Sequence, residues 1–157
     1  MTITYDELNP NHQEAHFTGT EQAAFYMPPV PGTDIGERWY VNLTGVVKFD
    51  FIGTGSSWPR ELFKIYVKFD RSRLPNWDSS KWFAIRDYTI FVAPNSFTNL
   101  GPSQYAGWAV DEFGSIGNYK VEDKVEFWAK LCVRDSDGIL HRISYNLTYI
   151  GDAVPPG

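Results

Sequence analysis

The sequence contains a single cysteine, Cys132, in 157 residues. One cysteine cannot form a disulfide within the chain, so the fold must rest on a hydrophobic core, which a chain of this length can supply. Cys132 lies inside an alternating apolar pattern, where a small packing residue is the simplest interpretation. The three histidines give no hint of a catalytic partner for its thiol.

Long apolar runs are also missing. No segment approaches the roughly 20 residues of a membrane span. The first residues lack the basic and apolar regions of a secretory signal, so we expect a cytoplasmic protein or one exported by a non-classical route. Contact with a membrane surface, without spanning it, stays open as an alternative.

Positive charge is scarce, with a formal net charge of −5. The one basic cluster comprises Lys64, Lys68, Arg71 and Arg73, and Asp70 interrupts it. Nucleic-acid binding draws its affinity from clustered lysine and arginine on phosphates. We therefore expect no nucleic-acid partner.

Motifs for cofactors and catalysis are absent from the sequence. Gly53-Thr54-Gly55 does not lead into a helix, as a nucleotide-binding loop would. The chain has no Gly-x-Ser-x-Gly nucleophile elbow and no His-Glu-x-x-His zinc motif. No cofactor is predicted, and an enzyme is the less favoured class.

Three groups could hold a metal ion, but each has a simpler interpretation. His12 and His16 have helical spacing in a segment without a helical pattern. Asp135–Gly138 begins like a calcium loop but lacks the later ligands, and a hairpin turn explains it. Asp111–Glu112 with Glu122–Asp123 is unspecific. We predict no metal site.

Aromatic residues are abundant, at 17% of the chain. Most lie in period-two alternation, which is typical of β-strands with one buried face. The clearest run is residues 38–51. Its odd positions hold the apolar side chains Trp39, Val41, Leu43, Val47, Phe49 and Phe51.

Further alternating or strand-like runs follow, of which residues 82–92 hold one or two strands, and we expect about seven or eight strands in all. These runs cover residues 62–69, 82–92, 108–113, 125–133 and 140–150. The pattern predicts an all-β fold, an antiparallel two-sheet β-sandwich, with a closed β-barrel as the alternative. A helix over residues 121–133 is a second alternative, because four apolar residues there also have helical spacing.

The chain divides at a change of pattern. Residues 1–36 show no sustained period, and we expect an irregular N-terminal arm packed on the domain or on a neighbour. A short helical turn from Thr20 to Phe25, ending before Pro28, is expected within it. Residues 37–157 are predicted to form a single β-sandwich domain.

Three long loops carry an aromatic residue beside planar polar groups. An aromatic ring can stack on the apolar face of a sugar while polar neighbours bind its hydroxyls. Each Trp could instead plug an open end of the sandwich. The candidate ligand-binding residues are Trp58, Arg60, Asn76, Trp77, Asp78, Gln104, Tyr105 and Trp108.

Trp128 lies on the face that alternation makes polar, among Glu126, Lys130 and Arg134. Such a residue is a candidate for a partner interface, unless another layer covers it. Asp50 and Asp87 are the acids most surrounded by apolar strand residues and would be the catalytic candidates in an enzyme.

The favoured hypothesis is a soluble, lectin-like carbohydrate-binding β-sandwich that stacks loop aromatics on sugar rings and is a homo-oligomer. The partner would be a glycan or another small polar ligand. The alternatives are a structural or assembly subunit, a toxin-like protein that inserts aromatic loops into a membrane surface, and a small β-barrel isomerase or cyclase with an aromatic pocket.

Overall fold

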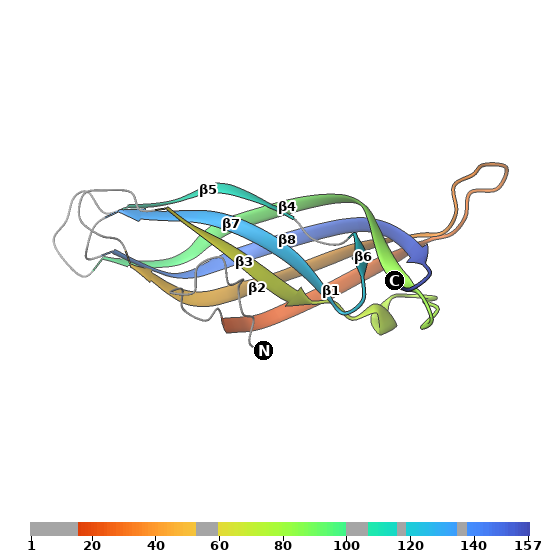
Figure 1. Ribbon diagram of the computed structural model, residues 1–157, viewed down its shortest axis with the longest axis horizontal. Helices are drawn as coiled ribbons and strands as arrows, with labels where there is room; N and C mark the ends of the chain where they lie inside the picture. Colours follow the sequence, from red (N-terminus) through yellow and green to blue (C-terminus); the bar gives the residue numbers. More distant parts are fainter. Residues whose placement is uncertain (1–15, 53–59, 100–106, 116–118, 135–137) are drawn as a thin grey trace.

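The structure, a computed structural model, describes residues 16–52, 60–99, 107–115, 119–134 and 138–157. Its side chains are described at residues 20–46, 65–93, 119–129 and 143–157. Figure 1 shows an elongated body of two layers of long strands. The strands of the described ranges are β1 (His16–Met27), β2 (Arg38–Ile52), β3 (Arg60–Lys68), β4 (Trp82–Asn99), β5 (Gly107–Ser115), β6 (Lys120–Val121), β7 (Lys124–Arg134) and β8 (Gly138–Val154).

The strands form two antiparallel sheets that are not closed into a barrel. One sheet has the order β1-β2-β8-β4-β6, and the other has the order β3-β7-β5. The all-β sandwich prediction is therefore confirmed, and the closed-barrel alternative is wrong. The helix alternative over residues 121–133 is also wrong, because β6 and β7 occupy those residues.

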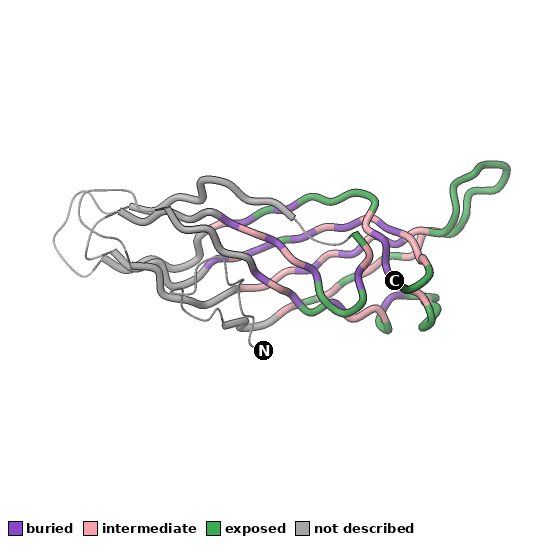
Figure 2. Tube along the Cα trace, viewed as in Figure 1, coloured by how far each residue is buried: buried purple, intermediate pink, exposed green. Residues whose placement is uncertain are grey.

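The core consists of the inward residues of both sheets, as the period-two pattern predicts. In β2 the buried residues are Trp39, Val41 and Leu43, and the half-buried residues between them face out (Figure 2). β8 alternates in the same way. The buried set also includes Ile65, Val67, Phe69, Phe83, Phe127, Ala129, Ile143, Tyr145, Leu147 and Tyr149.

The N-terminal segment departs from expectation. Residues 16–27 are not irregular, and the helical turn predicted from Thr20 to Phe25 is wrong. They form strand β1, which pairs with β2 from His16 opposite Lys48 to Met27 opposite Arg38. Alternation is weak there because the inward residues Gln22 and Ala24 are small or polar. The division of the chain at residue 36 stays a prediction.

The loops also differ in two places from the predicted pattern. β4 continues to Asn99, so the loop expected from residue 93 starts as strand. β7 and β8 do not form the predicted hairpin, because β7 pairs with β3 and β5 while β8 pairs with β2 and β4. Their connection crosses from one sheet to the other. The candidate calcium residues 135–137 lie outside the described residues.

Residues 28–37 form an arm that projects from the end of the β1–β2 pair (Figure 1). All of these residues are exposed, including Val30 and Ile35. Val30 and Ile35 are joined by a backbone hydrogen bond of 3.0 Å. At its base, the Tyr26 hydroxyl donates to Glu37 Oε2 at 2.8 Å, which raises the pKa of Tyr26. The arm is thus internally ordered.

The short strand β6 joins the two sheets at the end of the body that carries the arm. Val121 pairs with Phe83, and the Ile85 amide donates to the Tyr119 carbonyl at 2.7 Å. The Phe69 amide then donates to the Asp123 carbonyl at 2.9 Å, which ties the turn before β7 to the end of β3. In the described part of the chain, no helix is long and apolar enough to cross a membrane.

Candidate functional site

The candidate ligand-binding residues lie at two ends of the sandwich. Arg60 of β3 pairs with Cys132 of β7, and Trp108 of β5 pairs with Val133 of β7. The two therefore lie on either side of β7 at one end of the three-stranded sheet. The loop with Trp77 follows β3 at the other end. Trp58, Gln104 and Tyr105 lie outside the described residues, and the side chains of Arg60 and Trp108 are not described.

Trp77 packs into the end of the core. Its ring lies 4.9 Å from that of Trp39 and 6.2 Å from that of Phe83, measured between centroids. Trp77 is half-buried, and its Nε1 finds no acceptor among the described residues. Trp77 also lines a hollow of about 240 Å³ together with Arg71 and Asp123. These contacts match the expectation that such a Trp plugs an open end.

Asn76 and Asp78, which flank Trp77 in the sequence, help to set the conformation of the loop itself. Asn76 adopts a φ of 57°, a left-handed conformation that asparagine tolerates well. Asp78 accepts hydrogen bonds from the Ser80 hydroxyl at 2.7 Å and the Ser80 amide at 2.9 Å, and these hold the pKa of Asp78 below its usual value. Both residues are exposed.

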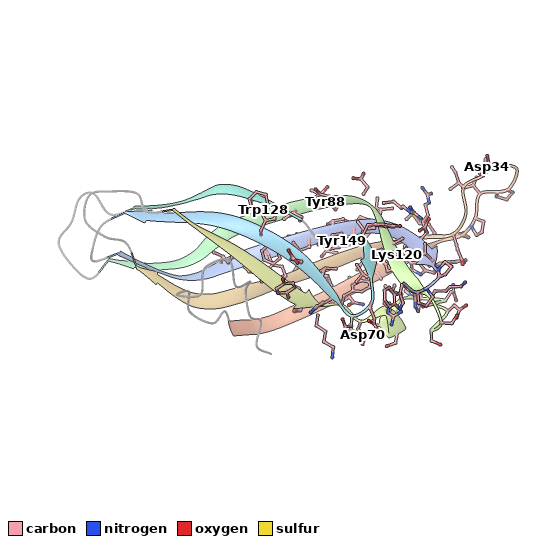
Figure 3. The ribbon with its side chains drawn as sticks, viewed as in Figure 1. Asp34, Asp70, Tyr88, Lys120, Trp128 and Tyr149 are labelled. Carbon is pink, nitrogen blue, oxygen red and sulfur yellow. The ribbon has the colours of Figure 1, made fainter. Side chains whose placement is uncertain are left out.

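A groove of about 450 Å³ runs around the turn between β6 and β7. Four aromatic residues line it: Tyr66, Trp82, Tyr88 and Tyr119. Lys124 Nζ lies 5.1 Å from the centroid of the Tyr66 ring, and Lys120 Nζ lies 6.0 Å from that of Tyr119. Since these cations already lie over two of the ring faces, the groove offers less bare aromatic surface than its composition suggests. Figure 3 shows Lys120 and Asp70 at the end of the body that carries the arm.

A shallow depression of about 720 Å³ lies on the five-stranded sheet. Phe91 of β4 borders it and is 61% exposed. The remaining lining residues are Thr20, Glu21, Thr44, Gly45, Val46, Ser144, Tyr145 and Asn146. Thr44, Ser144 and Asn146 are neutral hydroxyl or amide residues at outward positions of β2 and β8, and Glu21 is at an outward position of β1.

Side-chain hydrogen bonds hold the polar face beside this depression. Asn42 Nδ2 donates to Asn146 Oδ1 at 2.7 Å and to Thr148 Oγ1 at 3.1 Å. Beneath the depression, the Tyr145 ring lies inward at the position opposite Gly45, and its hydroxyl is 3.0 Å from Thr20 Oγ1. Burial raises the pKa of Tyr145, which keeps the phenol neutral. The depression therefore has an ordered floor.

The sequence pattern placed Asn42, Thr44, Asn146 and Thr148 on wet faces but did not single them out. Their signal was a run of planar amides and hydroxyls at alternate positions of two strands. That β2 and β8 are neighbours was needed to bring them together. Phe91 was missed because it lies in an apolar run, where alternation cannot tell an inward from an outward ring.

The other candidates are placed as follows. Trp128 is half-buried between the buried residues Phe127 and Ala129, on the outer side of the three-stranded sheet. Asp87 is exposed, and the side chain of Asp50 is not described. Among the described residues, no three His, Cys, Asp or Glu side chains gather as a metal site would require.

Comparisons with protein-family models, with curated proteins and with solved structures found no match for this chain.

Proposed function

We propose that the protein is a carbohydrate-binding β-sandwich and that the depression on the five-stranded sheet receives a neutral sugar. The observation that carries this proposal is the exposed ring of Phe91 beside a field of neutral hydrogen-bonding groups. A pyranose has an apolar C–H face and a rim of hydroxyls, and this surface offers a partner to each. The predicted function is retained, but its platform moves from the loops to the sheet.

The charge of the depression supports an uncharged ligand. Of the described residues that line it, Glu21 alone carries a formal charge. Ser144 and Asn146 lie on β8 beside Phe91 of β4, so an ordered strand pair supports both the stacking ring and the polar groups. A carboxylate such as Glu21 is a strong acceptor for sugar hydroxyls. An open, shallow site predicts weak binding of single sugars, strengthened by multivalency.

A glycan array, followed by NMR titration of the best ligand, tests the proposal. Phe91→Ala and Asn146→Ala should each weaken binding at least tenfold. Tyr88→Ala is the matched control, because Tyr88 is an exposed aromatic three residues before Phe91 that does not line the depression. Silence on the array, together with no chemical-shift change on the sheet, would contradict the proposal.

A structural or assembly role is the second candidate, and the projecting arm favours it. An ordered segment with exposed Val30 and Ile35 is suited to contact a neighbouring molecule. The isomerase alternative needed an interior aromatic pocket. The interior between the described parts of the two sheets is instead filled by core side chains, so we do not propose it.

A further inference from the structure

Strand β1 forms one edge of the five-stranded sheet, and no described strand pairs with its outer side. Along such an edge, alternate residues direct their backbone N–H and C=O groups away from the sheet. β1 is 12 residues long, and it pairs with β2 along its whole length, apart from the irregularity between Phe17 and Gly19. Its outer side therefore presents a long row of backbone donors and acceptors.

The usual protections of an exposed edge are missing from residues 20–27. This stretch has no proline, lysine or arginine, and its one charged residue is Glu21. The irregularity in the pairing of β1 with β2 lies earlier, between Phe17 and Gly19. Natural sheets place charges, proline or bulges on edges to prevent pairing with another chain. The absence of these features from residues 20–27 indicates that the edge of β1 pairs with a strand of another chain.

We propose that β1 pairs with β1 of a second copy, antiparallel across a two-fold axis, and joins two five-stranded sheets into one continuous sheet. Antiparallel pairing of identical strands is an isologous contact, in which both copies use the same surface and both β1 edges become paired. The interface thus closes on two copies rather than growing into a filament.

The side chains of β1 suit such an axis. In an antiparallel pair, directly opposed residues lie on the same face of the sheet. The two-fold axis must therefore pass between one residue and the same residue of the second copy. Ala23 and Ala24, at the middle of residues 20–27, are small enough for either register. Phe25, which is 66% exposed, would then lie opposite Glu21 or Ala23 of the second copy. Neither register places the two copies of Glu21 directly opposite each other.

Light scattering of the full chain over a concentration series tests the proposal. We expect twice the chain mass of 17.9 kDa. Ala23→Lys should weaken dimerisation at least tenfold by adding a charge at the edge. Thr89→Lys is the control, since Thr89 is also exposed but lies on β4, three strands away. A monomer at every concentration, or a dimer that Ala23→Lys leaves intact, would overturn the proposal.

The variants Ala23→Pro and Ala24→Pro separate an effect on pairing between copies from an effect on folding, because proline has no backbone N–H to donate. Of the Ala23 and Ala24 amides, one points to β2 and the other to the outer edge, because the direction alternates along a strand. Only the proline that removes the bond to β2 should lower the melting temperature in dilute solution. The variant with the unchanged melting temperature must be monomeric, and a dimer there would contradict the inference. Sugar binding by the Phe91 surface is measured separately, so either proposal can fail alone.

Discussion

Trp77 meets Trp39 with ring planes at 71° and centroids 4.9 Å apart. Trp39 is 1% exposed, and its Nε1 donates to the Pro75 carbonyl at 2.6 Å. The two indoles thereby hold the loop after β3 against β2. This arrangement makes Trp77 part of the core closure rather than a free ring for a ligand.

Trp77→Ala should lower the free energy of unfolding by about 2–3 kcal/mol, less than for a fully buried Trp because the ring is half-buried. Urea denaturation measures the change. Tyr119→Ala is the control and should cost less than about 1 kcal/mol, because Tyr119 is 54% exposed. Unchanged stability with loss of sugar binding would instead restore Trp77 as a stacking platform.

Gly151 and Gly36 should differ in how strongly a change to alanine affects stability. A Cβ on Gly151 would lie 2.2 Å from the Ala84 carbonyl oxygen and 2.5 Å from Phe83 Cζ, so backbone must move. Gly151→Ala should cost about 3 kcal/mol or prevent folding. Gly36, in the arm, has nothing within 4 Å, so Gly36→Ala should be neutral. Thermal melts of both variants check this, and equal effects would contradict it.

The Thr20 and Tyr145 hydroxyls should be energetically coupled. Their oxygen atoms lie 3.0 Å apart, and Tyr145 is 2% exposed. Gly45 of β2 lies between the two residues in the sheet. A double-mutant cycle with Thr20→Val and Tyr145→Phe should give a coupling of about 1 kcal/mol. A coupling of zero would mean that the hydroxyls do not bond in solution.

Asp70 should make stability depend on pH in the acid range. Hydrogen bonds from Ser72, led by its hydroxyl at 2.5 Å, hold the pKa of Asp70 below its usual value. Because the folded-state pKa is the lower one, this stabilisation is present above about pH 4 and is lost as the pH falls further. Ser72→Ala should reduce the loss of folding stability between pH 7 and pH 2.5, as measured by unfolding at these two pH values. An identical pH profile in the variant would contradict the assignment.

The strands could be predicted from sequence wherever one face of the strand is buried in the core and the other is exposed. Trp39, Val41 and Leu43 alternate with polar residues, so burial and strand could be inferred together. β1 could not be predicted because an edge strand beside the arm needs few apolar residues. Its inward residue Gln22 is polar: Nε2 donates to the Asp70 carbonyl at 2.8 Å, and Oε1 accepts from the Asp70 amide at 3.0 Å.

The candidate site was harder to predict because it depends on strand order. Asn146 and Phe91 are 55 positions apart in sequence and pair directly between β8 and β4. Periodicity reports which face a residue takes but contains no information on which strands are neighbours. For the same reason, periodicity could not show that β7 and β8 belong to different sheets, and the predicted hairpin between them is wrong.

The central place of β8 in the five-stranded sheet has a consequence for how the chain folds during synthesis. β8 lies between β2 and β4, although it is the final strand of the described chain. The pairs β1–β2 and β4–β6 cannot join until residues 138–154 have left the ribosome. Such long-range pairing is slow and leaves strands exposed, so the five-stranded sheet should form only after β8 has been synthesised.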